Sequence, residues 1–372
     1  MRALVLGATG TLGRRASGEL ARSEDVAGLV LSARDHGRVA RLASMLGGDD
    51  GRVRPAVVDV TDASQVAAAA GQVDVVVNCA GPAYELEFQA ASAVVDAGTP
   101  YVSLCDDAEP VDRLRSLDER ARSAGVTVVP GCGLSPGITN FLVALAAEEI
   151  DEVTEIDIAV ASSSMDASGP AAELHFLYSF TRPAIAVVDH ERVLEPSPGT
   201  PRLVYFPEPV GWGETFGCSH PEPITLEADW PGLRTLRFRM GLTERAVMDA
   251  TRALVASRLA GTHRGRHRLL RLSRPAKPLL QSLPPRGPSW SAARVDVRGT
   301  QDNRHTAVSL GVVDHLQNLA PLPLALAAVE LGTGRTVQPG VHAPEQVFAV
   351  KPLLRELTRR GIRIGRLQSD LV

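Results

Sequence analysis

The first residues that could do chemistry form the glycine-rich turn GATGTLG, in which Gly7, Gly10 and Gly13 recur at every third position. The turn follows the apolar run 3–6 and precedes an amphipathic helical pattern. Glycine lets the backbone approach a pyrophosphate, whose charge then faces the amide groups at the helix N-terminus. This order of elements predicts dinucleotide binding, and a tight turn that binds nothing is the alternative. The expected pyrophosphate contacts are Gly7, Thr9, Gly10, Thr11, Leu12 and Gly13.

The end of the second apolar strand, residues 28–32, indicates which dinucleotide is bound. An NAD site usually places a carboxylate there to hold the ribose 2′-hydroxyl. This chain has Ser32 and Arg34 instead, a hydroxyl and a guanidinium that suit a 2′-phosphate. Asp35 follows directly and leaves NAD as the alternative, in which Arg34 would merely cap a solvated loop. We therefore predict NADP(H).

Further apolar runs at 56–60, 101–105 and 126–130, and one that ends at Asn78, alternate with helical patterns. Such alternation predicts a parallel, doubly wound sheet, whose ligands bind beyond the carboxyl ends of its strands. Asp59 is expected to meet the adenine edge. The remaining cofactor contacts expected at these strand ends are Asp59, Val60, Cys79, Ala80 and Gly81.

The motif PGCGLSPGITN, residues 130–140, follows the last of these strands and is expected to face the nicotinamide. Its glycines would let the backbone approach the ring, and Asn140 would start the next helix. Cys132 lies between two glycines, so its thiol could contact the reacting bond. A small buried packing residue is the alternative for this cysteine.

The pattern changes near residue 152, where short period-two runs replace the strand–helix alternation. Strands and helices without βαβ units predict an antiparallel sheet with helices on one face. The expected fold class is thus α/β: a Rossmann sheet with an inserted α+β domain built on a mostly antiparallel sheet. The expected boundaries are 1–135 for the dinucleotide domain, 136–318 for the inserted substrate and dimerisation domain, and 319–372 for helices that return to the first domain.

Composition narrows the class of protein. The chain has 372 residues, enough for two lobes, and its net charge of −4 gives no general attraction to nucleic acid or membranes. No apolar run approaches the roughly 20 residues of a membrane-spanning helix. The first strand begins near Met1, so no signal peptide is expected, and the four cysteines form no CxxC pair. We expect a cytoplasmic protein without disulfides or a structural zinc.

Two other features bear on function. The only lysines are Lys277 and Lys351, which makes a Schiff-base mechanism improbable. The stretch 258–286 is dense in arginine, histidine and proline. It reads as a solvated connector with a short amphipathic helix, or alternatively as a docking segment for an anionic carrier or substrate.

These motifs together resemble the saccharopine dehydrogenase-like family, particularly saccharopine reductases and carboxynorspermidine dehydrogenases. The likeness covers most of the chain and rests on GATGTLG, NCAGPAYELEFQAASAVVDAGTPYVSLCDD, PGCGLSPGITN, FPEPVG with HPEPITL, and the closing GVHAPEQVF. It implies an NADP-dependent enzyme that joins or splits an amine and a carbonyl compound through an imine. The chain departs from the family at Ser135, where GCGxDPG often has aspartate, and LQNLAPLPLA lacks the frequent Thr-Gly.

Imine reduction needs a hydride donor, a proton for nitrogen and anchors for substrate carboxylates. Asp106 and Asp107 end the 101–105 strand, where they either cap the next helix or serve the substrate amine. His220 is a polar anchor or a structural residue. The expected catalytic residues are Asp106, Cys132 and His220. The expected substrate contacts are Tyr84, Cys105, Asp107, Gly133, Ser135 and Arg182, with Arg182 as the preferred carboxylate anchor.

The leading hypothesis is an NADPH-dependent oxidoreductase that reduces an imine to a secondary amine, or runs the reverse oxidation, in amino acid or polyamine metabolism. One alternative is an NADPH-dependent reductase of a C=C bond or ketone. A second is a non-catalytic NADP sensor or scaffold, for which the Ser135 departure is the main support. The expected partners are a small amine and a carbonyl compound, with no metal, nucleic acid or membrane, and exposed sheet in the second lobe favours a homodimer.

Overall fold

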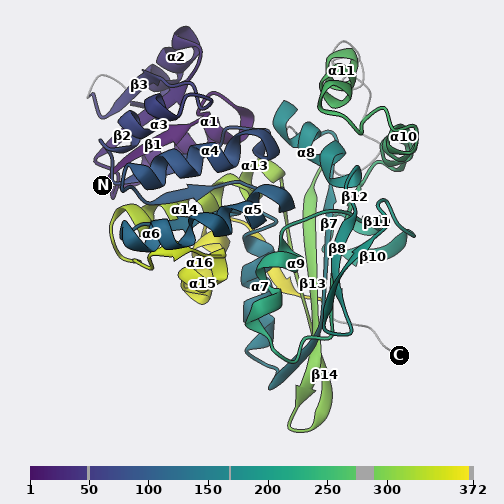
Figure 1. Cartoon of the computed structure of the whole chain (residues 1–372). Coiled ribbons are helices and arrows are strands. Elements are labelled where there is room, and N and C mark those ends of the chain that lie inside the picture. Colours follow the sequence, from purple (N-terminus) through teal and green to yellow (C-terminus); the bar gives the residue numbers. More distant parts are fainter. Residues whose placement is uncertain (48–50, 167–168, 274–288, 368–372) are drawn as a thin grey trace. The chain divides into compact units, whose positions relative to one another are not determined.

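The computed structural model describes residues 1–47, 51–166, 169–273 and 289–367 (Figure 1). The chain forms two compact units. The first comprises Met1–Ile138 and Ala320–Leu353, and the second comprises Thr139–Leu319 and Leu354–Val372. Among the described residues, no helix combines the length and the apolar character needed to cross a bilayer.

The first unit is built on a seven-stranded parallel sheet in the order β15-β6-β5-β4-β1-β2-β3. The strands are β1 (Arg2–Leu6), β2 (Gly28–Ala33), β3 (Val53–Val57), β4 (Val75–Asn78), β5 (Tyr101–Ser103), β6 (Thr127–Val129) and β15 (Gly340–Val341). The strand order reverses between β1 and β4, because the chain first builds outward to β3 and then returns to the other side of β1. This confirms the predicted doubly wound sheet and places its ligand crevice beyond these strand ends.

Helices cover this sheet: α1 (Thr11–Arg22), α2 (His36–Gly47), α3 (Ala63–Ala70), α4 (Ala83–Asp96), α5 (Ala108–Leu114), α6 (Asp118–Ser123), α14 (Pro321–Gly332) and α15 (Pro344–Val347), with a 3₁₀ turn at Arg115–Leu117. The central strands are buried on both faces and therefore read as continuous apolar runs. The apolar helix α14 packs on this sheet, where a Cβ on Gly332 would lie 2.8 Å from Val75 Cγ1.

Strand β3 begins three residues before the predicted strand 56–60, so the predicted bounds are wrong. It lies at the sheet edge and contains Pro55, a residue that sheets accept at their edges because it lacks an N–H. Asp59 and Val60 consequently lie in the loop after the strand, at its carboxyl end.

The second unit contains a nine-stranded sheet whose main order is β10-β11-β12-β7-β13-β14-β16, with β8 paired to β12 and β9. Its strands are β7 (Glu152–Ser162), β8 (Ala184–Val188), β9 (Glu191–Glu195), β10 (Arg202–Phe206), β11 (Gly211–Gly217), β12 (Thr235–Leu242), β13 (Ser291–Gln301), β14 (Arg304–Asp314) and β16 (Arg363–Arg366). Every pairing is antiparallel except that of β12 with β7, which confirms the predicted mostly antiparallel sheet.

The described helices that accompany this sheet are α7 (Ile138–Ala147), α8 (Pro170–Phe180), α9 (Glu222–Thr225), α10 (Arg245–Ala256), α11 (His263–Ser273) and α13 (Leu316–Leu319), with a 3₁₀ turn at Glu227–Asp229. Asn140 lies inside α7 and does not start it, which corrects that prediction. Of the basic stretch 258–286, residues 263–273 form α11, residues 258–262 form the turn before it, and residues 274–286 lie outside the described residues.

The end of the chain differs from the expected return of 319–372 to the first domain. Residues Ala320–Leu353 join the first unit, but β16 pairs antiparallel with β14 in the second. Helix α16 (Val350–Arg359) spans the division between the two units. A four-residue strand gives little signal of its own in the sequence, because its pairing with β14 is decided by a partner far along the chain.

Candidate functional site

The loops after β1, β4, β5 and β6 begin at one edge of the parallel sheet. Backbone hydrogen bonds join the first residues of these loops to the ends of the neighbouring strands. These bonds run from Cys79 N to Leu6 O (2.9 Å), Leu104 N to Asn78 O (3.2 Å), Cys132 N to Ser103 O (2.8 Å) and Ala8 N to Ser32 O (3.0 Å). The segments that carry Gly13, Gly81, Asp106 and Cys132 all start from these strand ends.

The glycine turn after β1 lies against the loop after β4. Gly7 has φ +71°, and a Cβ there would lie 2.7 Å from Ala80 N. A Cβ on Gly13 would collide with Gly7 O. Helix α1 has Gly10 at its N-cap, with no side-chain cap from the described residues and no acid in its first turn. Its first N–H groups have no acceptor within the helix, so the turn fits a dinucleotide pyrophosphate.

Ser32 and Arg34, at the end of β2, differ in their exposure to solvent. Ser32 is fully buried, and its hydroxyl donates to Val5 O at 3.0 Å, which argues against the predicted contact with a 2′-phosphate. Arg34 is exposed. Asp35 caps α2, since its Oδ1 accepts from Arg38 N at 3.0 Å. The carboxylate that could have held a ribose hydroxyl is thus committed to a helix end, which favours the guanidinium and a 2′-phosphate.

Asp59 is fixed in the loop after β3. Its carboxylate accepts from the backbone N–H and the hydroxyl of Thr61, and its own N–H donates to Gln65 Oε1 at 3.0 Å. The Thr61 hydrogen bonds, and then the nearby Arg34 charge, lower the pKa of Asp59. Val60 beside it is buried. These positions, next to Arg34 and beyond the strand end, suit the adenosine side of a dinucleotide.

A buried polar network beneath the ends of β4 and β5 was missed by the sequence analysis. Asn78 Nδ2 donates to Glu87 Oε2 at 3.0 Å and to the Tyr101 hydroxyl at 2.8 Å, while its Oδ1 accepts from Ala80 N at 2.9 Å. Ser103 Oγ donates to Glu87 Oε1 at 2.5 Å. The helical spacing in the sequence gave a signal for the burial of Glu87. It precedes the apolar Ala90 and Ala91 by three and four residues, which places all three on the buried side of α4.

Burial raises the pKa of Glu87 to about 7, against the opposing effect of hydrogen bonds from Ser103, Tyr101 and Asn78. Burial also raises the pKa of Cys79 to about 12 and those of Cys105 and Cys132 well above the ordinary thiol value. The three thiols are therefore protonated at neutral pH, whereas Glu87 titrates there.

The loop that contains Cys132 folds back on itself. Gly133 N donates to Pro136 O at 2.8 Å, and Gly133 O accepts from Ile138 N at 2.9 Å. Gly137 has φ +121°, and a Cβ there would collide with Gly133 O. The glycines thus permit contact within the loop, and the approach to the nicotinamide stays a prediction.

This geometry also bears on two residue assignments. Cys132 is 1% exposed, and burial raises the pKa of its thiol, which favours the packing role over the predicted catalytic one. Gly133 has both backbone polar groups engaged inside the loop, which argues against the predicted substrate contact. Ser135 is half-buried and stays a candidate contact.

The residues of the loop after β5 also differ in how deeply they are buried. Asp107 is buried, and its Oδ2 accepts from Tyr84 N at 2.8 Å, which ties this loop to the start of α4. Cys105 is buried and its N–H donates to Ser103 Oγ at 3.3 Å. These bonds give Asp107 and Cys105 structural roles in place of the predicted substrate contacts. Asp106 is half-buried and remains the candidate acid.

Tyr84 lines a cavity on the surface between α4 and α5, together with Phe88, Pro110 and Arg113. The Arg113 guanidinium lies 3.7 Å from the centroid of the Phe88 ring. Glu85 and Glu109 also line this cavity, so its charge is mixed, and Tyr84 keeps its place among the candidate contacts for a small polar group.

Comparison with known proteins now decides the nature of the first unit. Residues 3–129 match the family model described as the saccharopine dehydrogenase NADP binding domain. The match lies within the first unit and covers residues 3–129 of the 372-residue chain.

The whole chain is similar in fold to apo saccharopine dehydrogenase (L-Glu forming) from Saccharomyces cerevisiae. The TM-score is 0.69 at 16% sequence identity, with 99% of this chain and 100% of that chain covered. An engineered D-amino acid dehydrogenase bound to NADP⁺ matches with a TM-score of 0.50 at 17% identity, covering 97% of this chain and 99% of that one. At these identities the similarity shows a shared fold.

Beyond the NADP-binding domain, the second unit holds the predicted His220. This imidazole is buried, its Nδ1 pairs with Glu222, and its ring stacks on Phe238 with centroids 3.8 Å apart. Glu222 is itself fully buried and accepts from Thr139 Oγ1 at 2.9 Å. A carboxylate that fixes one ring nitrogen sets the orientation and tautomer of a histidine. Glu222 was missed, although HPEP places it two residues after His220.

The predicted anchor Arg182 is exposed after α8, with its guanidinium 5.1 Å from the centroid of the Tyr178 ring. Arg266 lies 4.9 Å from the centroid of the same ring. Arg237, on β12, is paired with Glu195 at 3.2 Å. Arg182 stays the predicted carboxylate anchor.

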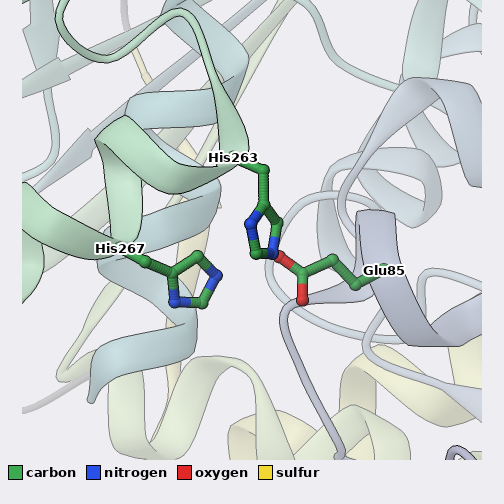
Figure 2. A group of neighbouring side chains, drawn as sticks. All are labelled: Glu85, His263 and His267. Carbon is green, nitrogen blue, oxygen red and sulfur yellow. The ribbon is translucent and has the colours of Figure 1, made fainter.

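Two imidazoles, those of His263 and His267, lie one turn apart on α11 with ring centroids 4.4 Å apart (Figure 2). Two nitrogen ligands from one helix fall short of the three or four that a protein zinc site uses. The pair therefore carries no metal assignment within the second unit.

The self-contact of the 130–137 loop predicts a large cost for Gly137→Ala. The new methyl group would meet the Gly133 backbone at a positive φ, and we expect a loss of about 3 kcal/mol of unfolding free energy. Gly125→Ala is the matched control, because Gly125 has φ +67° with no neighbour within 4 Å among the described residues. That control should cost about 1 kcal/mol in urea unfolding. Equal costs would contradict the assigned loop contact.

Proposed function

We propose that the protein is an NADPH-dependent oxidoreductase that reduces an imine, formed between an amine or amino acid and a carbonyl compound, to a secondary amine, or catalyses the reverse oxidation. The observation that carries this proposal is the glycine turn of an NADP-binding domain of the saccharopine dehydrogenase family, set against the loop after β4. The fold shared with a saccharopine dehydrogenase over the whole chain supports it.

The bound nicotinamide would supply or accept the hydride, and the chain would contribute binding, orientation and proton handling. The α1 N-terminus and Gly7–Gly13 would hold the pyrophosphate, and Arg34 the 2′-phosphate. Two groups are suited to proton handling: Asp106 after β5, and His220 with its orienting Glu222 in the second unit. Arg182 would anchor a substrate carboxylate.

The overall reaction is tested by supplying candidate partners separately and together. We expect NADPH oxidation to need both the amine and the carbonyl compound, and the product mass to contain both partners joined through nitrogen. Oxidation with a carbonyl compound or an activated alkene alone would favour the C=C or ketone reductase instead. Tight NADPH binding without oxidation by any tested pair would favour the sensor.

Cofactor choice is tested at Arg34. Because Arg34 is exposed at the β2 tip while Asp35 is committed to the α2 cap, Arg34→Glu should weaken NADPH binding at least about tenfold. NADH, which lacks the 2′-phosphate, should bind with nearly unchanged affinity in calorimetry. Arg38→Glu, at an exposed position one turn into α2, is the control. Equal weakening of both cofactors by Arg34→Glu would exclude the 2′-phosphate assignment.

Proton handling is tested at His220. If the imidazole transfers a proton, His220→Gln should lower kcat about a hundredfold. NADPH affinity should be unchanged, because the proposed cofactor contacts lie in the first unit. Glu222→Gln should reduce kcat less and shift its pH profile, since the carboxylate acts through the imidazole. Unchanged kcat in folded His220→Gln would show that this histidine is structural.

A further inference from the structure

Glu87 is a buried carboxylate that receives hydrogen bonds from three side chains. Ser103 Oγ and Asn78 Nδ2 donate to its two oxygens, and the Tyr101 hydroxyl is a third hydrogen-bond partner. It is 1% exposed, so water cannot replace a donor that is lost. An ionised carboxylate offers only acceptors, and this set of donors therefore matches the ionised form.

The network reaches the cofactor crevice through two backbone amides. Asn78 Oδ1 accepts from Ala80 N, and Ala80 N is the atom that a Cβ on Gly7 would meet at 2.7 Å. Ser103 Oγ accepts from Cys105 N, which begins the loop after β5. The orientation of the Asn78 amide thus sets how the loop after β4 lies beside the glycine turn, and the orientation of the Ser103 hydroxyl sets how the loop after β5 begins.

We infer that Glu87 is a positioning residue for the dinucleotide: as a carboxylate it holds the loop after β4 against the glycine turn and fixes the start of the loop after β5, and its protonation weakens cofactor binding. The inference rests on the proposed NADP binding and goes beyond it, because it makes affinity depend on a group outside the crevice.

Protonation would change the hydrogen-bond balance of the network. A neutral Glu87 carries its own O–H, so one of its donors would lose an acceptor. The Asn78 amide can answer by rotating, and that rotation would remove Oδ1 from Ala80 N. The loop after β4 would then lose the bond that sets its position beside Gly7.

The ionisable groups facing Glu87 are Asp106, Tyr101, Cys79 and Cys105. Burial raises the pKa values of Tyr101 and both thiols, so these stay neutral across the physiological range. Asp106 contributes a negative charge that also raises the pKa of Glu87, after the larger effect of burial. With the pKa of Glu87 at about 7, its ionised fraction rises between pH 5.5 and 8.5.

Ionisation of Glu87 has opposite effects on folding stability and on cofactor affinity. The unfolded carboxyl loses its proton near its ordinary pKa of 4.5, whereas the folded one keeps it up to about pH 7. The folded state binds more protons over that interval, so Glu87 makes the fold less stable as pH rises through it. Cofactor binding, which uses the ionised form, should strengthen over the upper part of the same interval. A purely structural Glu87 would change stability without changing affinity.

The test measures NADP⁺ affinity by calorimetry at pH 5.5 and 8.5 for the full chain and Glu87→Gln. We expect the variant to bind about tenfold more weakly at pH 8.5 and to match the unaltered chain at pH 5.5. The 2′-phosphate also titrates near pH 6, but every variant shares this effect. Glu119→Gln, an exposed glutamate on α6, is the control and should follow the unaltered chain.

Two more variants test the route through Asn78. Asn78→Ala should weaken NADP⁺ at pH 8.5, and adding Glu87→Gln to it should cause little further loss, because both act on one bond. Tyr101→Phe keeps the carboxylate but removes a donor, so the midpoint of the affinity profile should move to higher pH. This variant decides the matter if Glu87→Gln fails to fold.

The outcomes separate the two levels of the proposal. If the unaltered chain binds NADP⁺ while Glu87→Gln keeps the same affinity at both pH values, or Tyr101→Phe keeps the same midpoint, the role of Glu87 is overturned and the proposed function stands. If the unaltered chain does not bind NADP⁺ at either pH, the proposed function fails first.

Discussion

The backbone contact between Gly7 and Ala80 is the constraint on which the first unit depends. It brings the turns after β1 and β4 together at the point where the strand order reverses, and there is no room between them for a side chain at position 7. Parallel strands that are buried on both faces fix where these turns begin. The first amides of α1 have no acceptor within the helix, and a pyrophosphate is stabilised at such a helix N-terminus.

Polar residues at these strand ends fall into two groups. The side chains of Ser32, Asp35 and Asp107 make hydrogen bonds within the protein, to a backbone group of β1, of α2 and of α4 respectively. Arg34 and Asp106 are exposed or half-buried at the same edge. Burial accounts for Ser32 and Asp107, because a buried polar group must find a partner in the protein, whereas the exposed Asp35 is held by its cap on α2. Ligand contacts should therefore be sought among the polar groups that remain accessible.

The strands and the glycine turn could be predicted because each has a local pattern. The run Ala3–Leu6, the triplet that ends at Gly13 and the reading of a mostly antiparallel second sheet all depend on neighbours in the sequence. The contacts of Ser32 and Gly133 could not be predicted this way, because they are made by folding a loop or a neighbouring strand onto these residues. The pairing of β16 with β14 has the same long-range origin.

The central claim is that the amide groups at the start of α1 bind the pyrophosphate of NADP⁺, with the loop after β4 beside them. A crystal structure of the protein grown with NADP⁺ tests it most directly. The pyrophosphate is predicted within hydrogen-bond distance of the backbone N–H groups of Thr11–Gly13, with the 2′-phosphate at Arg34. A dinucleotide bound elsewhere, with this turn occupied only by solvent, would contradict the claim.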